Sequence, residues 1–129
     1  MKIIKILIFT FLISSNLYSQ EKNVLSATFE NENHIFVKNG KNVVLSFSLN
    51  ANEMEKKHIS KFFENNNYIF NLISETSENE NTKYKISFIN KKKEGNLQML
   101  YKIFSNLNLK NFVYNKKKYP ISECLNVLK

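Results

Sequence analysis

Residues 43–49 read VVLSFSL, and this stretch decides the fold because its side chains alternate in character. The apolar residues Val43, Leu45, Phe47 and Leu49 occupy every second position, with smaller or polar residues between them. Such alternation is expected of a β-strand that is buried on one face. The strand therefore predicts a sheet with one face toward a core and the other toward water.

The segments that follow this strand alternate between helical and strand patterns. Asn50 or Asn52 can cap a helix, and Glu53 and Glu55 lie in its first turn, where the helix dipole favours negative charge. The predicted elements are a helix over about 52–66, strands 68–75 and 83–90, a helix over about 96–107, strand 111–115, a short extended segment 119–121 and a last helix over about 122–128.

From residue 43 onward the predicted order is strand, helix, strand, strand, helix, strand. This is the βαββαβ order of ferredoxin-like domains, in which two helices pack on one face of an antiparallel sheet. The likeness is one of element order, without a shared motif. We therefore predict an α+β fold with this order, preceded by an N-terminal β-hairpin and followed by a short C-terminal helix.

Two further strands, 24–30 and 34–38, precede residue 43. Asn39-Gly40 predicts a type I′ turn, because both residues tolerate the positive φ that this turn needs. The turn would place strand 34–38 beside strand 43–49, where the standard ferredoxin-like order has the last strand. Either the last strand moves elsewhere, or the N-terminal pair folds away as an accessory hairpin.

Residues 1–20, MKIIKILIFTFLISSNLYSQ, follow the order of a secretory signal peptide. Lys2 and Lys5 precede an apolar run over residues 6–13, and Ser19 offers a small residue for cleavage. The alternatives are a buried N-terminal helix or an uncleaved anchor. We expect residues 21–129 to form one small domain that is exported, either to the periplasm or as a secreted protein.

The composition excludes most catalytic machinery. All 11 acidic residues are Glu, all 19 strong bases are Lys, and Asp, Arg and Trp are absent. Without Arg the chain lacks bidentate recognition of bases or phosphates, so nucleic acid is the weaker candidate partner. Gly40 and Gly95 are too isolated to cradle a phosphate. We predict no enzyme and no catalytic, cofactor-binding or metal-ligating residues.

The chain has two histidines, His34 and His58, and one cysteine, Cys124. A metal carrier or small enzyme built from these three residues is the hypothesis that the sequence supports least, because they do not have the spacing of metal ligands. Apolar neighbours predict that Cys124 packs under the last helix. The other interpretation is a reactive or intermolecular thiol.

Lysines cluster at strand ends, and their position follows from chain direction. Consecutive elements reverse, so the runs after strands 83–90 and 111–115, and the lysines beside Asn39-Gly40, are expected at one end of the sheet. The residues of this predicted lysine-rich end are Lys38, Lys41, Lys91, Lys92, Lys93, Lys116, Lys117 and Lys118. Glu53, Glu55, Glu78 and Glu80 are expected at the opposite end.

Three functions follow from these features. The first is a non-catalytic binding or interaction domain whose partner is an unknown protein, using an uncovered sheet face lined by Ser46 and Ser48 or by Lys83, Lys85 and Ser87. The second is peripheral association of the lysine-rich end with an anionic envelope component, either membrane or polysaccharide. The third is the His/Cys hypothesis above. The lysines also have a plainer interpretation as solubilising loop residues.

Overall fold

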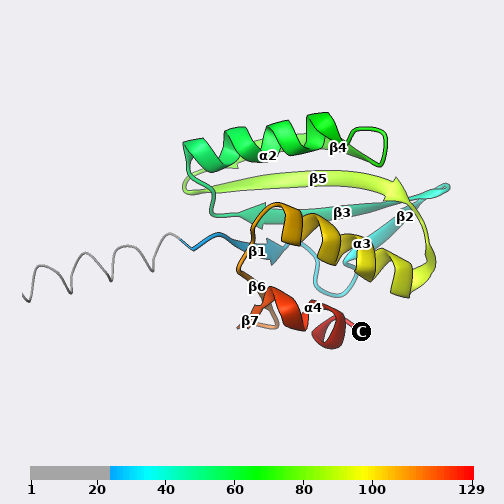
Figure 1. The fold of residues 1–129 in the computed structure, drawn as a ribbon. Helices are drawn as coiled ribbons and strands as arrows, with labels where there is room; N and C mark the ends of the chain where they lie inside the picture. The colour runs from blue at the N-terminus through cyan, green and yellow to red at the C-terminus, as the bar shows by residue number, and fades with distance from the viewer. Residues whose placement is uncertain (1–23) are drawn as a thin grey trace, which may run out of the picture.

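The computed structural model describes residues 24–129, so the expected signal peptide at 1–20 lies outside the described residues. The described part is an α+β fold with a mixed seven-stranded sheet and three helices (Figure 1). The strands are β1 (Ser26–Phe29), β2 (Phe36–Asn39), β3 (Asn42–Leu49), β4 (Phe70–Glu78), β5 (Asn81–Ile89), β6 (Asn111–Tyr114) and β7 (Lys117–Pro120). The helices are α2 (Glu53–Asn65), α3 (Lys92–Asn106) and α4 (Cys124–Val127), the last preceded by a 3-10 turn at Ile121–Glu123.

Strand β3 organises the sheet, as its alternation predicts. Its side chains are alternately buried and partly exposed, and the buried ones are the apolar residues at positions 43, 45, 47 and 49. β3 pairs antiparallel with β5 along its whole length, from Asn42 opposite Ile89 to Leu49 opposite Thr82. The hydrophobic core therefore lies against one face of this central pair.

The strand order differs from the ferredoxin-like expectation. The order is β4-β5-β3-β1-β6-β7, so β1 occupies the place beside β3 that the standard order gives to the last βαββαβ strand. The Asn50 side chain, directly after β3, accepts a hydrogen bond from the Ser26 backbone N–H at 2.8 Å and donates one to the Val24 carbonyl at 3.0 Å. These two bonds hold the start of β1 beside the end of β3, and β6 lies one place further out.

The expected all-antiparallel sheet is wrong at one pair. β1 and β6 both run opposite to β3, so they become parallel neighbours when β1 lies between β3 and β6. The expected N-terminal hairpin is also wrong, because β1 and β2 each pair with β3 in the described sheet. β2 pairs with residues 42–45 of β3, and β1 pairs with residues 47–49.

The β2–β3 turn lies one residue later than predicted. Asn39 pairs with Asn42, so the two central residues are Gly40 and Lys41, and of these two Gly40 has a positive φ of 65°. A glycine in the first central position is typical of a type II′ turn. The Asn-Gly pair thus indicated the right hairpin with the wrong register.

Both long helices cover the same face of the sheet, as predicted. The Phe63 ring of α2 lies 6.2 Å from the Tyr84 ring of β5, and the Phe104 ring of α3 lies 5.3 Å from the Phe47 ring of β3. Tyr84 and Phe47 are opposite each other in the β3–β5 register and their rings stack at 5.7 Å. Helix α2 therefore lies over the β4–β5 side and α3 over the β3–β1 side (Figure 1).

The starts of the two long helices are fixed in different ways. Asn52 caps α2, with its side chain accepting from the Glu55 N–H at 2.8 Å while the Glu55 carboxylate accepts from the Asn52 N–H at 2.9 Å. Helix α3 begins at Lys92, four residues earlier than the sequence pattern predicts. It therefore includes Lys93, which the sequence placed in a loop.

Candidate binding cleft at the lysine-rich end

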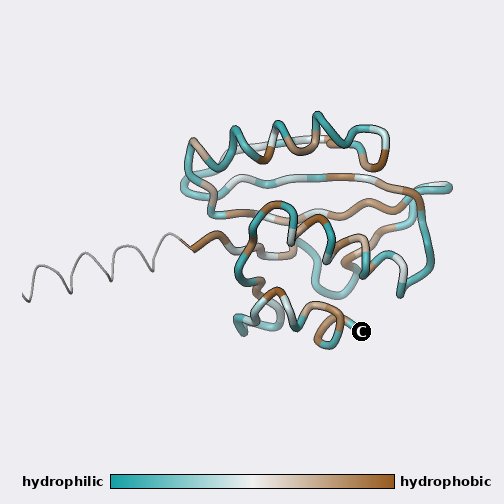
Figure 2. Tube along the Cα trace, viewed as in Figure 1, coloured by the Kyte–Doolittle hydropathy of each residue, from teal (hydrophilic) through white to brown (hydrophobic). Residues whose placement is uncertain are grey.

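Two connections meet at one end of the sheet. The Asn90 backbone N–H, after β5, donates to the Lys41 carbonyl in the β2–β3 turn at 3.0 Å. Both connections lie at the right of Figure 1, and the same segments are hydrophilic in Figure 2. Lysines from two separate parts of the chain, Lys38 and Lys41 from one and Lys91 to Lys93 from the other, are therefore brought together.

Two asparagine side chains shape the connection between β5 and α3. The Asn96 side chain is almost fully buried, with 4% exposure, and accepts from the Lys91 N–H at 2.9 Å. The Asn90 side-chain oxygen accepts from the Asn96 amide at 2.9 Å and from the Lys92 N–H at 3.2 Å. Lys92 has a φ of 66°, which non-glycine residues adopt at a cost. The network thus fixes a strained lysine at the helix start.

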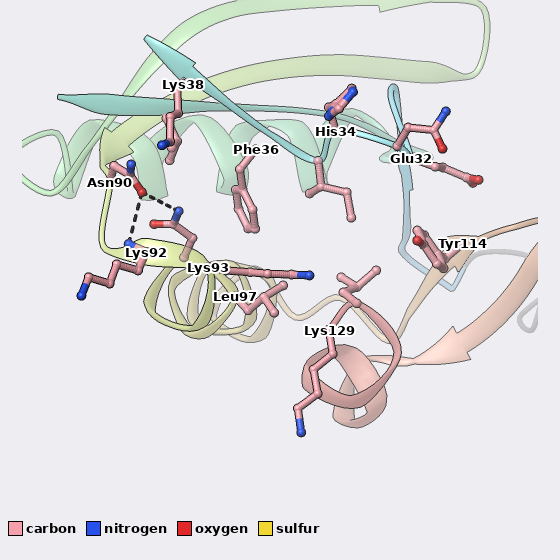
Figure 3. Close-up of a pocket in the computed structure, with 15 residues that line it drawn as sticks. Glu32, His34, Phe36, Lys38, Asn90, Lys92, Lys93, Leu97, Tyr114 and Lys129 are labelled. Atoms are coloured by element: carbon pink, nitrogen blue, oxygen red, sulfur yellow. Dashed lines mark hydrogen bonds between the residues drawn. The ribbon is translucent and has the colours of Figure 1, made fainter. Parts of the chain in front are cut away.

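A cavity of about 540 Å³ opens between this end of the sheet, the start of α3 and the C-terminal segment (Figure 3). This volume is in the range of small-molecule sites. Four lysines line it: Lys38, Lys92, Lys93 and Lys129. Apolar residues form much of the rest of its surface, namely Ile35, Phe36, Val43, Leu97 and Leu128.

The lysines of the cleft are not equivalent in orientation. In Figure 3 the side chain of Lys93 extends across the cavity, and that of Lys38 points down toward it from β2. The amino groups of Lys92 and Lys129 point away from the cavity centre. Lys93 and Lys38 are therefore the two cations best placed to contact a ligand inside the cleft.

Carboxylates do not neutralise the cleft. The ion pairs among the described residues 24–129 are Lys56–Glu53 at 3.2 Å and Lys83–Glu78 at 3.3 Å, both outside it. Glu32 also lines the cavity, where its carboxylate accepts a hydrogen bond from the Asn115 N–H at 3.1 Å. Four lysines against this one glutamate leave the lining side chains with a net positive formal charge.

The eight predicted lysines divide into two groups. Lys38, Lys92 and Lys93 line the cavity, and Lys41 and Lys91 are exposed on the connections beside it. Residues 116–118 belong to the β6–β7 hairpin and lie outside the lining. The structure thus brings five of the eight together.

The second lysine run is separated from the first by strand register. β6 does run in the expected direction, opposite to β3. However, Val113 pairs with Thr28, which pairs with Ser48, so the β6–β7 turn leaves the sheet near the middle of β3 and not beyond Asn42. Chain direction alone did not reveal this shift along the strand axis.

Sequence reasoning missed several residues of the cleft, among them Phe36, Tyr114 and Lys129. Phe36 looked like an ordinary strand residue, and no pattern singled out the other two. Their role depends on where the C-terminal segment packs, which the buried residues Ile121, Cys124 and Leu128 determine. Their apolar spacing indicated a packed helix, but not which surface it would adjoin.

The histidines and the cysteine lie in different parts of the fold. His34 is at the rim of the cleft, His58 lies on α2 beside a separate cavity, and Cys124 is buried at the start of α4. Within residues 24–129 no group of three or more His, Cys or acidic residues is arranged to hold a metal ion. Burial raises the pKa of the Cys124 thiol from 9.0 to about 12 and so disfavours the thiolate, the form that reacts or binds a metal.

The first function hypothesis uses the sheet face opposite the helices. Lys83 and Lys85 are exposed on it, Ser46 and Ser48 are partly exposed, and Ser87 is buried. None of the helices in residues 24–129 is both long and apolar enough to cross a membrane.

Comparison of the chain with protein-family models, curated proteins and solved structures gives no match. The cleft is therefore interpreted from its own geometry and charge.

Proposed function

We propose that this chain is a small, exported, non-catalytic binding domain whose ligand-binding site is the lysine-lined cleft. The observation that carries the proposal is the convergence of Lys38 from β2 and Lys93 from α3 on one cavity, with Lys92 and Lys129 at its rim. Cations from separate elements around one concavity favour an anionic ligand, because each adds to the same local potential.

The chemistry of lysine favours a particular kind of recognition. An ammonium is a compact charge with three rotatable donors, whereas arginine would impose a fixed bidentate geometry. The cleft is therefore suited to a carboxylate or similar oxyanion held mainly by charge, with affinity that falls as salt rises. The absence of Asp and Arg from the whole chain supports the non-catalytic part of the proposal.

The export part of the proposal rests on residues 1–20, with their basic start and short apolar run. Expression of the full chain in a bacterium with a secretory system should give a processed protein outside the cytoplasm. N-terminal sequencing should place the cleavage near Ser19. An unprocessed protein in the cytoplasm would remove this part of the proposal and leave the cleft untouched.

The cleft itself is tested by a charge-matched pair of variants. The first replaces Lys38, Lys92 and Lys93 by Gln, and the control replaces residues 116–118 by Gln, so both lose three positive charges. Amide chemical shifts are followed by NMR during titration with acetate, citrate and inorganic phosphate. We expect shifts centred on Asn90 and Asn96 that disappear in the first variant and persist in the control. Equal loss in both variants would show a diffuse charge effect and contradict the cleft.

A second candidate function is peripheral association with an anionic membrane or polysaccharide surface. The observation that favours it is that Lys41 and Lys91, outside the cavity, are exposed at the same end as the cleft lysines. Each lysine near an anionic leaflet contributes about 1 kcal/mol, so a group of five can give salt-sensitive attachment.

Lys41→Gln and Lys91→Gln together distinguish this second function from the first. If surface attachment is the function, the double variant should lose sedimentation with phosphatidylglycerol vesicles and retention on heparin, while small-anion binding in the cleft is kept. Absence of vesicle and heparin binding by the unmodified protein at low salt would remove the second candidate.

We also interpret residues 42–114 as a ferredoxin-like unit that has accepted β1 between its first and last strands. The support is the order and direction of β3, α2, β4, β5, α3 and β6.

A further inference from the structure

The cleft has apolar walls on two sides. Phe36, from β2, projects into the cavity, and Leu97 of α3 faces it from the other side (Figure 3). The Phe36 ring packs edge-on against the buried Phe88 ring with centroids 6.1 Å apart, so its position is fixed by the core. A ligand that enters between the two walls thus meets preformed apolar surface.

Lys93 lies between these walls. Its side chain extends from the first turn of α3 across the cavity (Figure 3). A second cavity, of about 660 Å³, lies between α3 and α4 and shares Lys93, Leu97 and Lys129 with the first. Leu125 adds apolar surface there. The Lys93 side chain therefore has apolar surface available to a ligand on both sides of it.

A simple inorganic anion would use the cations of this cleft and leave its apolar walls exposed to water. A neutral hydrocarbon would cover the walls and leave Lys93 without a counter-charge. From this combination we infer that the cleft binds a long-chain carboxylate, with its carboxylate on the Lys93 ammonium and its hydrocarbon chain between Phe36 and Leu97. The inference rests on the proposed function and narrows the ligand to an anionic amphiphile.

The two halves of such a ligand contribute in measurably different ways. Each methylene that leaves water for an apolar surface is worth about 0.8 kcal/mol, or about a fourfold gain in affinity. The carboxylate–ammonium contact is a charge-assisted hydrogen bond, whose loss reduces affinity by about tenfold. Affinity should thus depend on chain length through the walls and on charge through Lys93.

The experiment is a calorimetric titration of the purified protein with hexanoate, octanoate and decanoate below their micellar concentrations, with 1-decanol as the uncharged comparison. We expect an increase of about fourfold per added methylene and weaker binding of the alcohol. Lys93→Gln should weaken decanoate by about tenfold and leave decanol unchanged. Lys61→Gln, at an exposed lysine of α2 that lies outside the cleft lining, is the matched control and should bind as the unmodified protein does.

Phe36→Ala tests the apolar wall, and its expected effect is a smaller gain per methylene with an unchanged response to acetate. Circular dichroism checks that this variant is folded. If it is not, the Lys93→Gln and Lys61→Gln variants, both at exposed positions, still test the proposal.

The outcomes separate this inference from the function on which it rests. One outcome is that affinity does not change from hexanoate to decanoate while acetate and phosphate still bind through Lys38, Lys92 and Lys93. This result overturns the inference of an amphiphilic ligand and leaves the proposed anion site standing. The role of Lys93 is overturned if decanol binds as tightly as decanoate, or if the Lys93→Gln and Lys61→Gln variants have equal effects. Absence of any anion from the cleft overturns both proposals.

Discussion

The buried Asn96 side chain donates a hydrogen bond to the Asn90 side-chain oxygen at 2.9 Å, and this pair determines how the chain passes from β5 into α3. Asn96 also accepts from the Lys91 N–H, and Asn90 from the Lys92 N–H. The orientation of the lysines at the cleft therefore depends on two neutral amides that carry no charge themselves.

Removal of the Asn96 amide should destabilise the fold and disturb the cleft together. Asn96→Ala leaves the Lys91 N–H without its acceptor and removes one of the two donors to the Asn90 oxygen. This loss should cost about 1–3 kcal/mol of the free energy of unfolding. Urea unfolding measures this. Asn106→Ala is the control, because Asn106 is exposed and its amide binds a carbonyl of its own helix, so its loss should cost less than about 0.5 kcal/mol. If the two substitutions lower the free energy of unfolding equally, the Asn90–Asn96 pair contributes no more to stability than an exposed side-chain hydrogen bond.

Two turns with left-handed residues should respond in opposite directions to substitution. Lys116 has a φ of 65° in the β6–β7 turn. Lys116→Gly should raise the free energy of unfolding by about 0.5 kcal/mol, because the backbone strain that it relieves outweighs the conformational freedom that glycine adds to the unfolded chain. Gly40, also at 65°, should lose about 1 kcal/mol on replacement by Ala. Thermal unfolding measures both.

Gly40 makes this comparison clean, because a Cβ there would meet no atom within 4 Å. The loss in Gly40→Ala is then a backbone effect and not a steric clash. A stabilised Gly40→Ala variant would contradict the type II′ turn.

The aromatic cluster under α3 should be the most sensitive part of the core. Phe104 is fully buried and its ring lies 6.0 Å from Phe29 and 5.3 Å from Phe47, so it joins β1 and β3. Phe104→Ala should lower the free energy of unfolding by about 3–5 kcal/mol. Tyr101, on the same helix but exposed, is the control, and Tyr101→Ala should lower the free energy of unfolding much less. Chemical denaturation distinguishes the two.

Stability should fall in alkaline solution, in part because of Cys124. Its pKa is raised by burial from 9.0 to about 12, so the neutral thiol contributes its full stabilisation below pH 9.0 and loses it as the pH rises toward 12. Cys124→Ala should remove this part of the pH dependence. The measurement is the free energy of unfolding of both proteins between about pH 8 and about pH 10.5. Parallel curves for the two proteins would contradict the role of the thiol.

Tyr84 must be separated from Cys124 in this measurement. The pKa of Tyr84 is raised above its usual value of 10.0, first by burial and next by the Glu75 carboxylate. This carboxylate accepts a hydrogen bond from the Tyr84 hydroxyl at 3.3 Å. The contribution of Tyr84 to the free energy of unfolding is also lost as the pH rises, but the loss begins at a higher pH than for Cys124. Tyr84→Phe removes it, and the Cys124 effect should persist in that background.

The sequence predicted those parts of the fold that depend on local pattern. The alternation around Phe47 predicted β3, and the Asn52 and Glu55 pair marked the start of α2. It did not predict the insertion of β1, because that depends on hydrogen bonds from the Asn50 side chain to residues far away in the chain. Asn50 was considered as a helix cap, which is a local role, whereas its partners belong to another strand.

The candidate site shows the same division. Chain direction places the lysines after β5 and those beside Gly40 at one end, and the Asn90–Lys41 contact joins them. The sequence could not show the axial shift of the β6–β7 turn, because register between strands is set by tertiary packing. The cleft wall at Phe36 escaped notice for a similar reason, since a strand pattern does not reveal which residue faces a neighbouring helix.

The parallel pairing of Ser26 with Asn111 has a consequence for how the polypeptide reaches its native state. A contact between the first and the penultimate strand closes a very long loop, and topologies rich in such contacts fold slowly. The side of the sheet beyond β1, which β6 and β7 form, stays incomplete until the final quarter of the chain has been synthesised. If the chain is exported as proposed above, it would therefore cross the membrane before this side of the sheet has paired.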